Sequence, residues 1–139
     1  MDHLEAVADA IQQFEGWGPD TRSYRNRNPG NLRSSPFSHR QDADGYAIFD
    51  SLDQGYNGLL YDLTAKFCGE GRFSVGQDST LLELFEVWAP SVSGNHPKQY
   101  ATYVAHWLSI ALGRQYGIDA PLKAIWQPET VDRSGLVEE

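Results

Sequence analysis

The stretch AIQQFEGWGPDTRSYRNRNPGNLR, residues 10–33, decides the fold, because it joins the end of an apolar helix to a loop dense in Arg, Asn, Pro and Gly. Helical spacing of apolar residues predicts a first helix over residues 2–15, with Asp2 and Glu5 as a capping box and Gly16 as its stop. The predicted buried stripe also carries one carboxylate, Glu15, and consists of Leu4, Val7, Ala8, Ile11 and Phe14.

The chemistry of Glu15 follows from this expected position. Desolvation on an apolar stripe raises the pKa of a carboxyl, and the negative end of the helix dipole acts in the same direction. Both favour a protonated acid near neutral pH, which is the state that a glycosidic general acid needs. The alternative is a Glu at the rim of the stripe, paired with one of the arginines that follow.

Composition limits the class of protein. The chain has 139 residues, of which 40% are hydrophobic, and a net charge of −8. We therefore expect a single domain over residues 1–127 and a polar tail over residues 128–139. The acidic balance argues against nucleic acid and anionic membranes as partners and favours a polysaccharide. No segment suggests a signal peptide or membrane insertion, and we expect a monomer.

Redox and metal chemistry find no support in the sequence. The single cysteine, Cys68, excludes an internal disulfide and is expected to be a small core residue. The four histidines are scattered without metal-ligand spacing, so we predict no metal and no cofactor.

The rest of the chain predicts an α+β fold that is predominantly helical. Residues 31–34 and 46–49 are expected to form a small β-hairpin, with a turn at Asp44-Gly45. Further helices are predicted from Ser51 to the glycine at 69, after the Thr80–Glu83 capping box, from Pro97 to Gly113, and over residues 120–127. Gly55 and Gly58 weaken their helix, so they are expected to admit another backbone at close range.

Several segments together resemble a known superfamily. These are FEGWG and RSYRNRNPGNLR, then DGYAIFDSLDQGYNGLLYDL, and finally WAP with NHPKQYATYVAHWLSIALG. They are similar to a phage and bacterial branch of the lysozyme-like superfamily, whose relatives are lytic transglycosylases and goose-type lysozymes. The likeness spans roughly residues 10–113, and the run Arg25–Arg33 is its most specific part.

The resemblance implies a lysozyme-like fold with a small hairpin lobe flanking a cleft, and it implies roles for particular residues. Glu15 matches the catalytic acid/base at the end of the first long helix. Trp88 stands where such relatives more often have Tyr, and we interpret it as a packing indole. The expected substrate-binding residues are Arg25, Asn28, Gly30 and Asn31 of the loop, Tyr46 and Phe49 of the hairpin, and Tyr100 of the long helix.

Two reactions are compatible with this reading. Hydrolysis requires a second carboxylate, for which Asp42 and Asp44 are candidates, with Asp50 and Asp53 further along the chain. A lytic transglycosylase needs one acid only, because the C6 hydroxyl of the sugar attacks intramolecularly and leaves a 1,6-anhydro end. We expect the non-hydrolytic cleavage of the bond between N-acetylmuramic acid and N-acetylglucosamine in peptidoglycan.

Three alternatives stay open. They are a hydrolytic muramidase, a related enzyme that cuts chitin or chitosan, and a non-catalytic glycan-binding or virion structural protein. With peptidoglycan as substrate, the protein would act at the cell wall, in the periplasm, after release or delivery. A phage endolysin and a protein secreted by a non-classical route are both consistent with the sequence.

Overall fold

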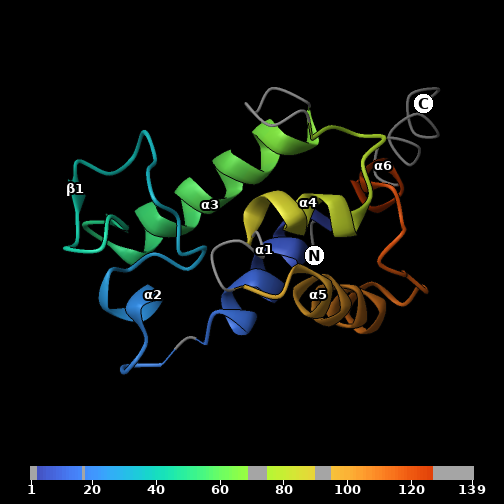
Figure 1. Ribbon diagram of the computed structural model, residues 1–139, viewed down its shortest axis with the longest axis horizontal. Coiled ribbons are helices and arrows are strands. Elements are labelled where there is room, and N and C mark those ends of the chain that lie inside the picture. Colours follow the sequence, from blue (N-terminus) through green and yellow to red (C-terminus); the bar gives the residue numbers. More distant parts are fainter. Residues whose placement is uncertain (1–2, 17, 69–74, 90–94, 127–139) are drawn as a thin grey trace, which may run out of the picture. The chain divides into compact units, whose positions relative to one another are not determined.

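The computed structural model describes residues 3–16, 18–68, 75–89 and 95–126. The chain divides into two compact units, Met1–Ala65 and Lys66–Glu139. This division does not test the single domain over residues 1–127, which stays a prediction. The predicted tail over residues 128–139 lies outside the described residues. The fold is mixed, with helices and one small antiparallel sheet (Figure 1).

The first unit begins with helix α1, His3–Phe14. Its predicted stripe is buried over about two turns, from Leu4 to Ile11, whereas Phe14 is 38% exposed and was wrongly assigned to the core. Gly16 ends the helix in the left-handed conformation, with φ +79°, as predicted. Asp2 of the predicted capping box lies outside the described residues.

A short helix, α2, follows over Arg22–Arg25 and was not predicted. The side chain of Thr21 caps it by accepting a hydrogen bond from the backbone N–H of Tyr24. Four residues are too few to produce a hydrophobic period, which explains why the sequence pattern missed it.

The hairpin consists of β1, Arg40–Gln41, paired antiparallel with β2, Ala47–Ile48. The Asp44-Gly45 turn is confirmed, with Gly45 at φ +89°. The predicted strand over residues 31–34 is wrong, because Asn31 has φ +51°, which no extended strand adopts. The chain at Leu32 still contacts β2, since its carbonyl accepts a hydrogen bond from the N–H of Ala47 at 2.9 Å.

Helix α3, Leu52–Phe67, begins after Ser51, whose hydroxyl accepts the N–H of Gln54 as predicted. The close approach at its glycines is confirmed. A Cβ on Gly55 would overlap the carbonyl oxygen of Arg27, and one on Gly58 would lie 2.9 Å from the Phe49 ring. Leu59, Leu63 and Phe67 are fully buried, but Leu52 is 44% exposed. Cys68, which lies just beyond the helix, is exposed and is no core residue.

The second unit contains α4, Leu81–Trp88, α5, Pro97–Leu112, and α6, Leu122–Trp126. The capping box of Thr80 and Glu83 and the left-handed Gly113 that ends α5 are both confirmed. Helices α4 and α5 pack together, and the ring of Phe85 stacks on that of Tyr100 at 4.4 Å. Among the described residues, no helix is long and apolar enough to cross a membrane.

The indole of Trp88 acts as a packing group within this unit. It lies edge-on to Phe85 at 6.5 Å, and the Nζ atom of Lys66 lies over its ring at 5.2 Å.

Candidate functional site

Glu15 directly follows the last helical residue of α1. Its backbone N–H still donates to the carbonyl oxygen of Ile11 at 2.9 Å, so the residue continues the final helical turn. The side chain is half-buried. Glu15 therefore lies at the C-terminal end of α1, where the helix dipole is negative, and the residue is only partly exposed to water.

The loop after α2 is held against the hairpin by two buried asparagines. The side-chain amide of Asn26 donates a hydrogen bond to Asp42 at 2.9 Å. The backbone carbonyl of Asn26 accepts a hydrogen bond from the backbone N–H of Phe49. Asn28 has no exposed surface, and its amide donates to the carbonyl oxygens of Leu32 and Ala47 at 2.8 and 2.9 Å. Its own Oδ1 accepts the N–H of Leu32. The Asn28 amide and the backbone carbonyl of Leu32 together satisfy the outer edge of β2 at Ala47, in place of a third strand.

Three residues with predicted substrate contacts are buried in this arrangement. Asn28 and Phe49 have no exposed surface, and Gly30 is also buried. They support the loop and the hairpin from the inside. In this arrangement, the side chains of Asn28 and Phe49 have no surface on which a substrate could lie.

Tyr46 lies beneath two cations. The guanidinium carbons of Arg22 and Arg33 lie 4.2 and 4.3 Å from the centre of its ring. Arg33 also bonds to the Tyr46 hydroxyl and to the carbonyl oxygen of Asp44, both at 3.2 Å. A sugar that contacted the ring of Tyr46 would therefore have to compete with these two arginines for it. Figure 1 shows the hairpin near the start of α3.

Asp42 is the central acceptor of the hairpin. Its Oδ1 accepts the backbone N–H groups of Tyr46 and Asp44, both at 2.9 Å. The hydrogen bond from Tyr46, then those from Asn26 and Asp44 and the charge of Arg22, hold the pKa of this carboxyl below its ordinary value, against a smaller effect of burial. Asp42 is thus an ionised, structurally engaged carboxylate.

The second candidate carboxylate, Asp44, lies on the surface. Its side chain is 68% exposed and forms an ion pair with Arg22 at 2.9 Å. Asp42 and Asp44 are therefore both paired with Arg22, whereas Asp50 pairs with Arg40 and Asp53 is exposed in the first turn of α3.

The remaining predicted contact residues of the loop have different environments. Arg25 is exposed, and its guanidinium donates to the carbonyl oxygen of Asp20 at 2.6 Å. Asn31 combines its left-handed φ of +51° with a buried Oδ1 atom that has no hydrogen-bond partner. An unpaired buried oxygen on a strained backbone is a feature that concentrates at functional sites.

Tyr100 belongs to the second unit, in the first turn of α5. It is 3% exposed and stacks on Phe85. Glu15, the loop and the hairpin belong to the first unit, and within that unit the structure brings the loop and the hairpin together.

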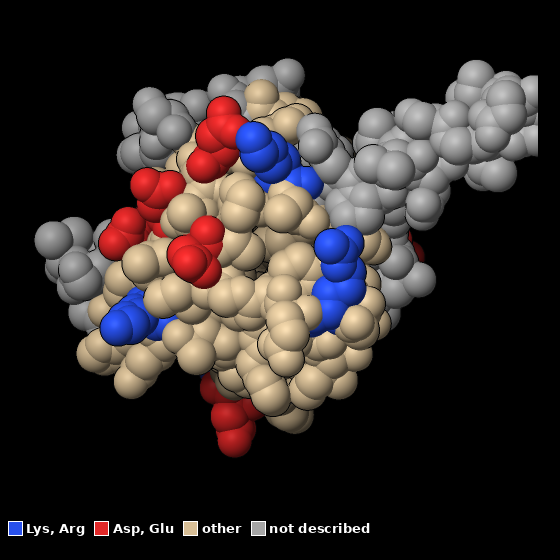
Figure 2. All heavy atoms as spheres, turned by 90° about the vertical axis from the view of Figure 1, so that its right-hand side faces the viewer, with Lys and Arg blue, Asp and Glu red and all other residues tan. Residues whose placement is uncertain are grey.

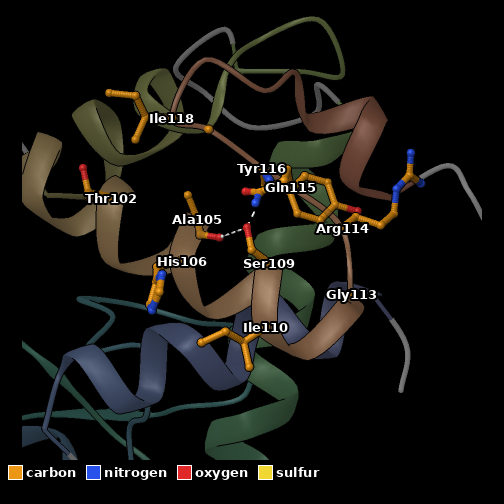
Figure 3. A pocket seen from close by; sticks show the side chains of 11 residues that line it. Thr102, Ala105, His106, Ser109, Ile110, Gly113, Arg114, Gln115, Tyr116 and Ile118 are labelled. Atoms are coloured by element: carbon orange, nitrogen blue, oxygen red, sulfur yellow. Dashed lines mark hydrogen bonds between the residues drawn. The ribbon is translucent and has the colours of Figure 1, made fainter.

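A hollow of about 720 Å³ is present in the second unit, and none of the residues that line it is a predicted site residue. One face of α5 and the segment after it line the hollow, and Figure 3 shows the Ser109 hydroxyl bonded to the carbonyl of Ala105 and to the N–H of Tyr116. The face drawn in Figure 2 is mostly uncharged, with single charged side chains rather than a continuous basic area. In the described part of the chain, no three His, Cys, Asp or Glu side chains are arranged to hold a metal ion.

The sequence reasoning missed Asn26 and the pairing of Arg22 and Arg33 with Tyr46. Strand-like alternation could not have marked Asn26, because the backbone is not extended there: Asn26 has φ −90° and ψ 2°, and Arg27 has φ +51°. The arginine partners depend on contacts 11–24 residues apart along the chain and have no local signal.

Comparison of the chain with protein-family models, with curated proteins and with solved structures gave no match.

Proposed function

We propose that this chain cleaves the β-1,4 bond between N-acetylmuramic acid and N-acetylglucosamine in peptidoglycan, on a lysozyme-like fold, with Glu15 as the acid. Glu15 protonates the oxygen of the glycosidic bond, and the resulting carboxylate then accepts the proton of the C6 hydroxyl of the N-acetylmuramic acid. That hydroxyl attacks the anomeric carbon, so the product is a 1,6-anhydro-muramoyl end. The proposed substrate implies action at the cell wall, after release or delivery.

The observation that carries the proposal is the position of Glu15. Glu15 is a half-buried residue directly after α1, and it belongs to the same unit as a donor-rich loop whose backbone is fixed by the buried amide of Asn28. Partial burial and the helix C-terminus both favour the neutral form of a carboxyl, which is the form that donates a proton. A fixed loop of donors supplies the rigidity that substrate positioning requires.

The state of the aspartates favours the non-hydrolytic route. Asp42 is ionised and accepts three hydrogen bonds, and Asp44 is paired with Arg22. A hydrolase that used Asp42 or Asp44 to activate water would have to release it from these partners, whereas an intramolecular nucleophile needs no second carboxylate. Tethered nucleophiles reach effective molarities of roughly 10⁵–10⁸ M in favourable cases.

The test compares Glu15→Gln with Glu5→Gln, which changes an exposed carboxylate on the same helix. Purified peptidoglycan is incubated with each protein, and the released fragments are analysed by mass spectrometry. We expect at least a 100-fold loss of fragment release for Glu15→Gln only, within the usual size of a general-acid contribution, and anhydro ends from the unchanged protein. Reducing ends would instead indicate a muramidase, and binding without cleavage by the unchanged protein would indicate a glycan-binding module.

A further inference from the structure

Four of the five arginines in the first unit have partners. Arg22 and Arg33 lie on Tyr46, and the guanidiniums of Arg25 and Arg40 bond to Asp20 and Asp50. The fifth, Arg27, is exposed, and its guanidinium has no hydrogen-bond or ion-pair partner among the described residues. In a chain of net charge −8, this cation is available for an external anion.

The backbone beneath Arg27 is fixed on every side. Its two neighbours, Asn26 and Asn28, are buried and bonded to the hairpin. Its carbonyl oxygen lies against α3 where Gly55 leaves room. Arg27 itself has φ +51°, a left-handed conformation in which glycine or asparagine would be less strained.

The strain and the exposure together need an explanation. Among the described residues the Arg27 guanidinium forms no hydrogen bond or ion pair, so its charge adds no such interaction to the stability of the loop. Strained positions held by their surroundings concentrate at functional sites, where they direct a side chain. Because the backbone at Arg27 is already fixed, less conformational entropy is lost when the arginine binds a ligand.

We propose that Arg27 is a specificity residue that pairs with a carboxylate of the glycan substrate, which rests on the proposed function. Planar guanidinium groups bind carboxylates through two parallel hydrogen bonds. Muramic acid offers such a group either as its lactyl carboxylate or through an attached peptide, whereas chitin is uncharged. Arg27 therefore discriminates acidic glycans from neutral glycans of the same backbone.

The experiment measures binding by calorimetry in the Glu15→Gln background, so that no probe is cleaved. The probes are a peptide-free oligomer of N-acetylglucosamine and N-acetylmuramic acid, the same oligomer with peptides attached, and a chitin oligomer of equal length. Arg27→Asn is the test variant, because asparagine tolerates the left-handed backbone. Arg114→Gln, which removes an exposed arginine in the second unit, is the matched control.

We expect Arg27→Asn to weaken binding of at least one muramic oligomer by about 10-fold or more, which is the usual minimum for a lost charged hydrogen-bond pair. Binding of the chitin oligomer is expected to change less than two-fold, and Arg114→Gln to change neither. Loss with the peptide-free oligomer identifies the lactyl carboxylate, and loss only with the peptide-bearing oligomer identifies the peptide.

Two results overturn the inference in different ways. If Arg27→Asn leaves the binding of the muramic oligomers unchanged, or weakens the binding of muramic and chitin oligomers equally, the role of Arg27 is refuted while the proposed function stays intact. Absence of binding of every probe to the Glu15→Gln protein itself refutes both the proposed substrate and the role of Arg27.

Discussion

Replacing Asn28 with alanine tests whether one buried amide organises the first unit. The side chain makes three hydrogen bonds, two donated to the carbonyls of Leu32 and Ala47 and one accepted from the N–H of Leu32. At about 0.5–1.5 kcal/mol for each bond, and with buried backbone groups left unpaired, we expect Asn28→Ala to lower the free energy of unfolding by about 3–4 kcal/mol. This is a large share of the roughly 5–15 kcal/mol that stabilises an ordinary domain.

Urea denaturation followed by circular dichroism measures the loss, and hydrogen exchange at the amides of Leu32 and Ala47 locates it. Asn28→Asp keeps the shape of the side chain but places a carboxylate against two carbonyl oxygens, so it should destabilise at least as much. Asn57→Ala, at an exposed position of α3, should change stability by no more than about 0.5 kcal/mol. If Asn28→Ala unfolds within 1 kcal/mol, as a rough limit, of the unchanged protein, and both amides stay protected, the reasoning is refuted.

Three further outcomes are expected. Gly55→Ala forces its Cβ into the carbonyl of Arg27 and should cost about 1–3 kcal/mol of stability, whereas Gly18→Ala, with open space around it, should be nearly neutral by the same denaturation assay. The folded-state pKa of Asp42 lies below its ordinary value of 3.8, so its stabilising contribution is complete above about pH 4 and is lost as the pH falls through the folded-state pKa. Asp42→Asn should therefore be less stable at neutral pH, and its free energy of unfolding should fall less steeply with decreasing pH on the acid side. An unchanged acid-side slope would contradict the lowered pKa of Asp42. Tyr116→Phe removes a buried hydroxyl without a hydrogen-bond partner, so thermal unfolding should show equal or higher stability, and a clear loss would mean that the hydroxyl is paired in solution.

Helix ends were predictable because their signals are local. Gly16 and Gly113 stop α1 and α5 in the left-handed conformation, and Thr80 caps α4 through the expected box. Each signal depends on residues within one helical turn, so a single sequence contains it. The close approaches at Gly55 and Gly58 were also anticipated, although not the groups that approach them.

The hairpin partner and the loop geometry were not predictable in the same way. The segment at Leu32 satisfies the edge of β2 with a side-chain amide from Asn28 and one backbone bond, so it carries no strand pattern of its own. For the candidate site, the sequence pointed to Glu15 and the loop as a whole. It gave no means to separate the arginines held on Tyr46 from Arg27, because that difference depends on tertiary contacts.

The two-residue strands have a consequence for how the protein responds to heat. A hairpin this short has little stability of its own, and here its order depends on amides from a neighbouring loop. As the temperature rises, the lobe should therefore soften before the helices melt. Any task that depends on the shape of this lobe would then fail at temperatures where the helical signal is still intact.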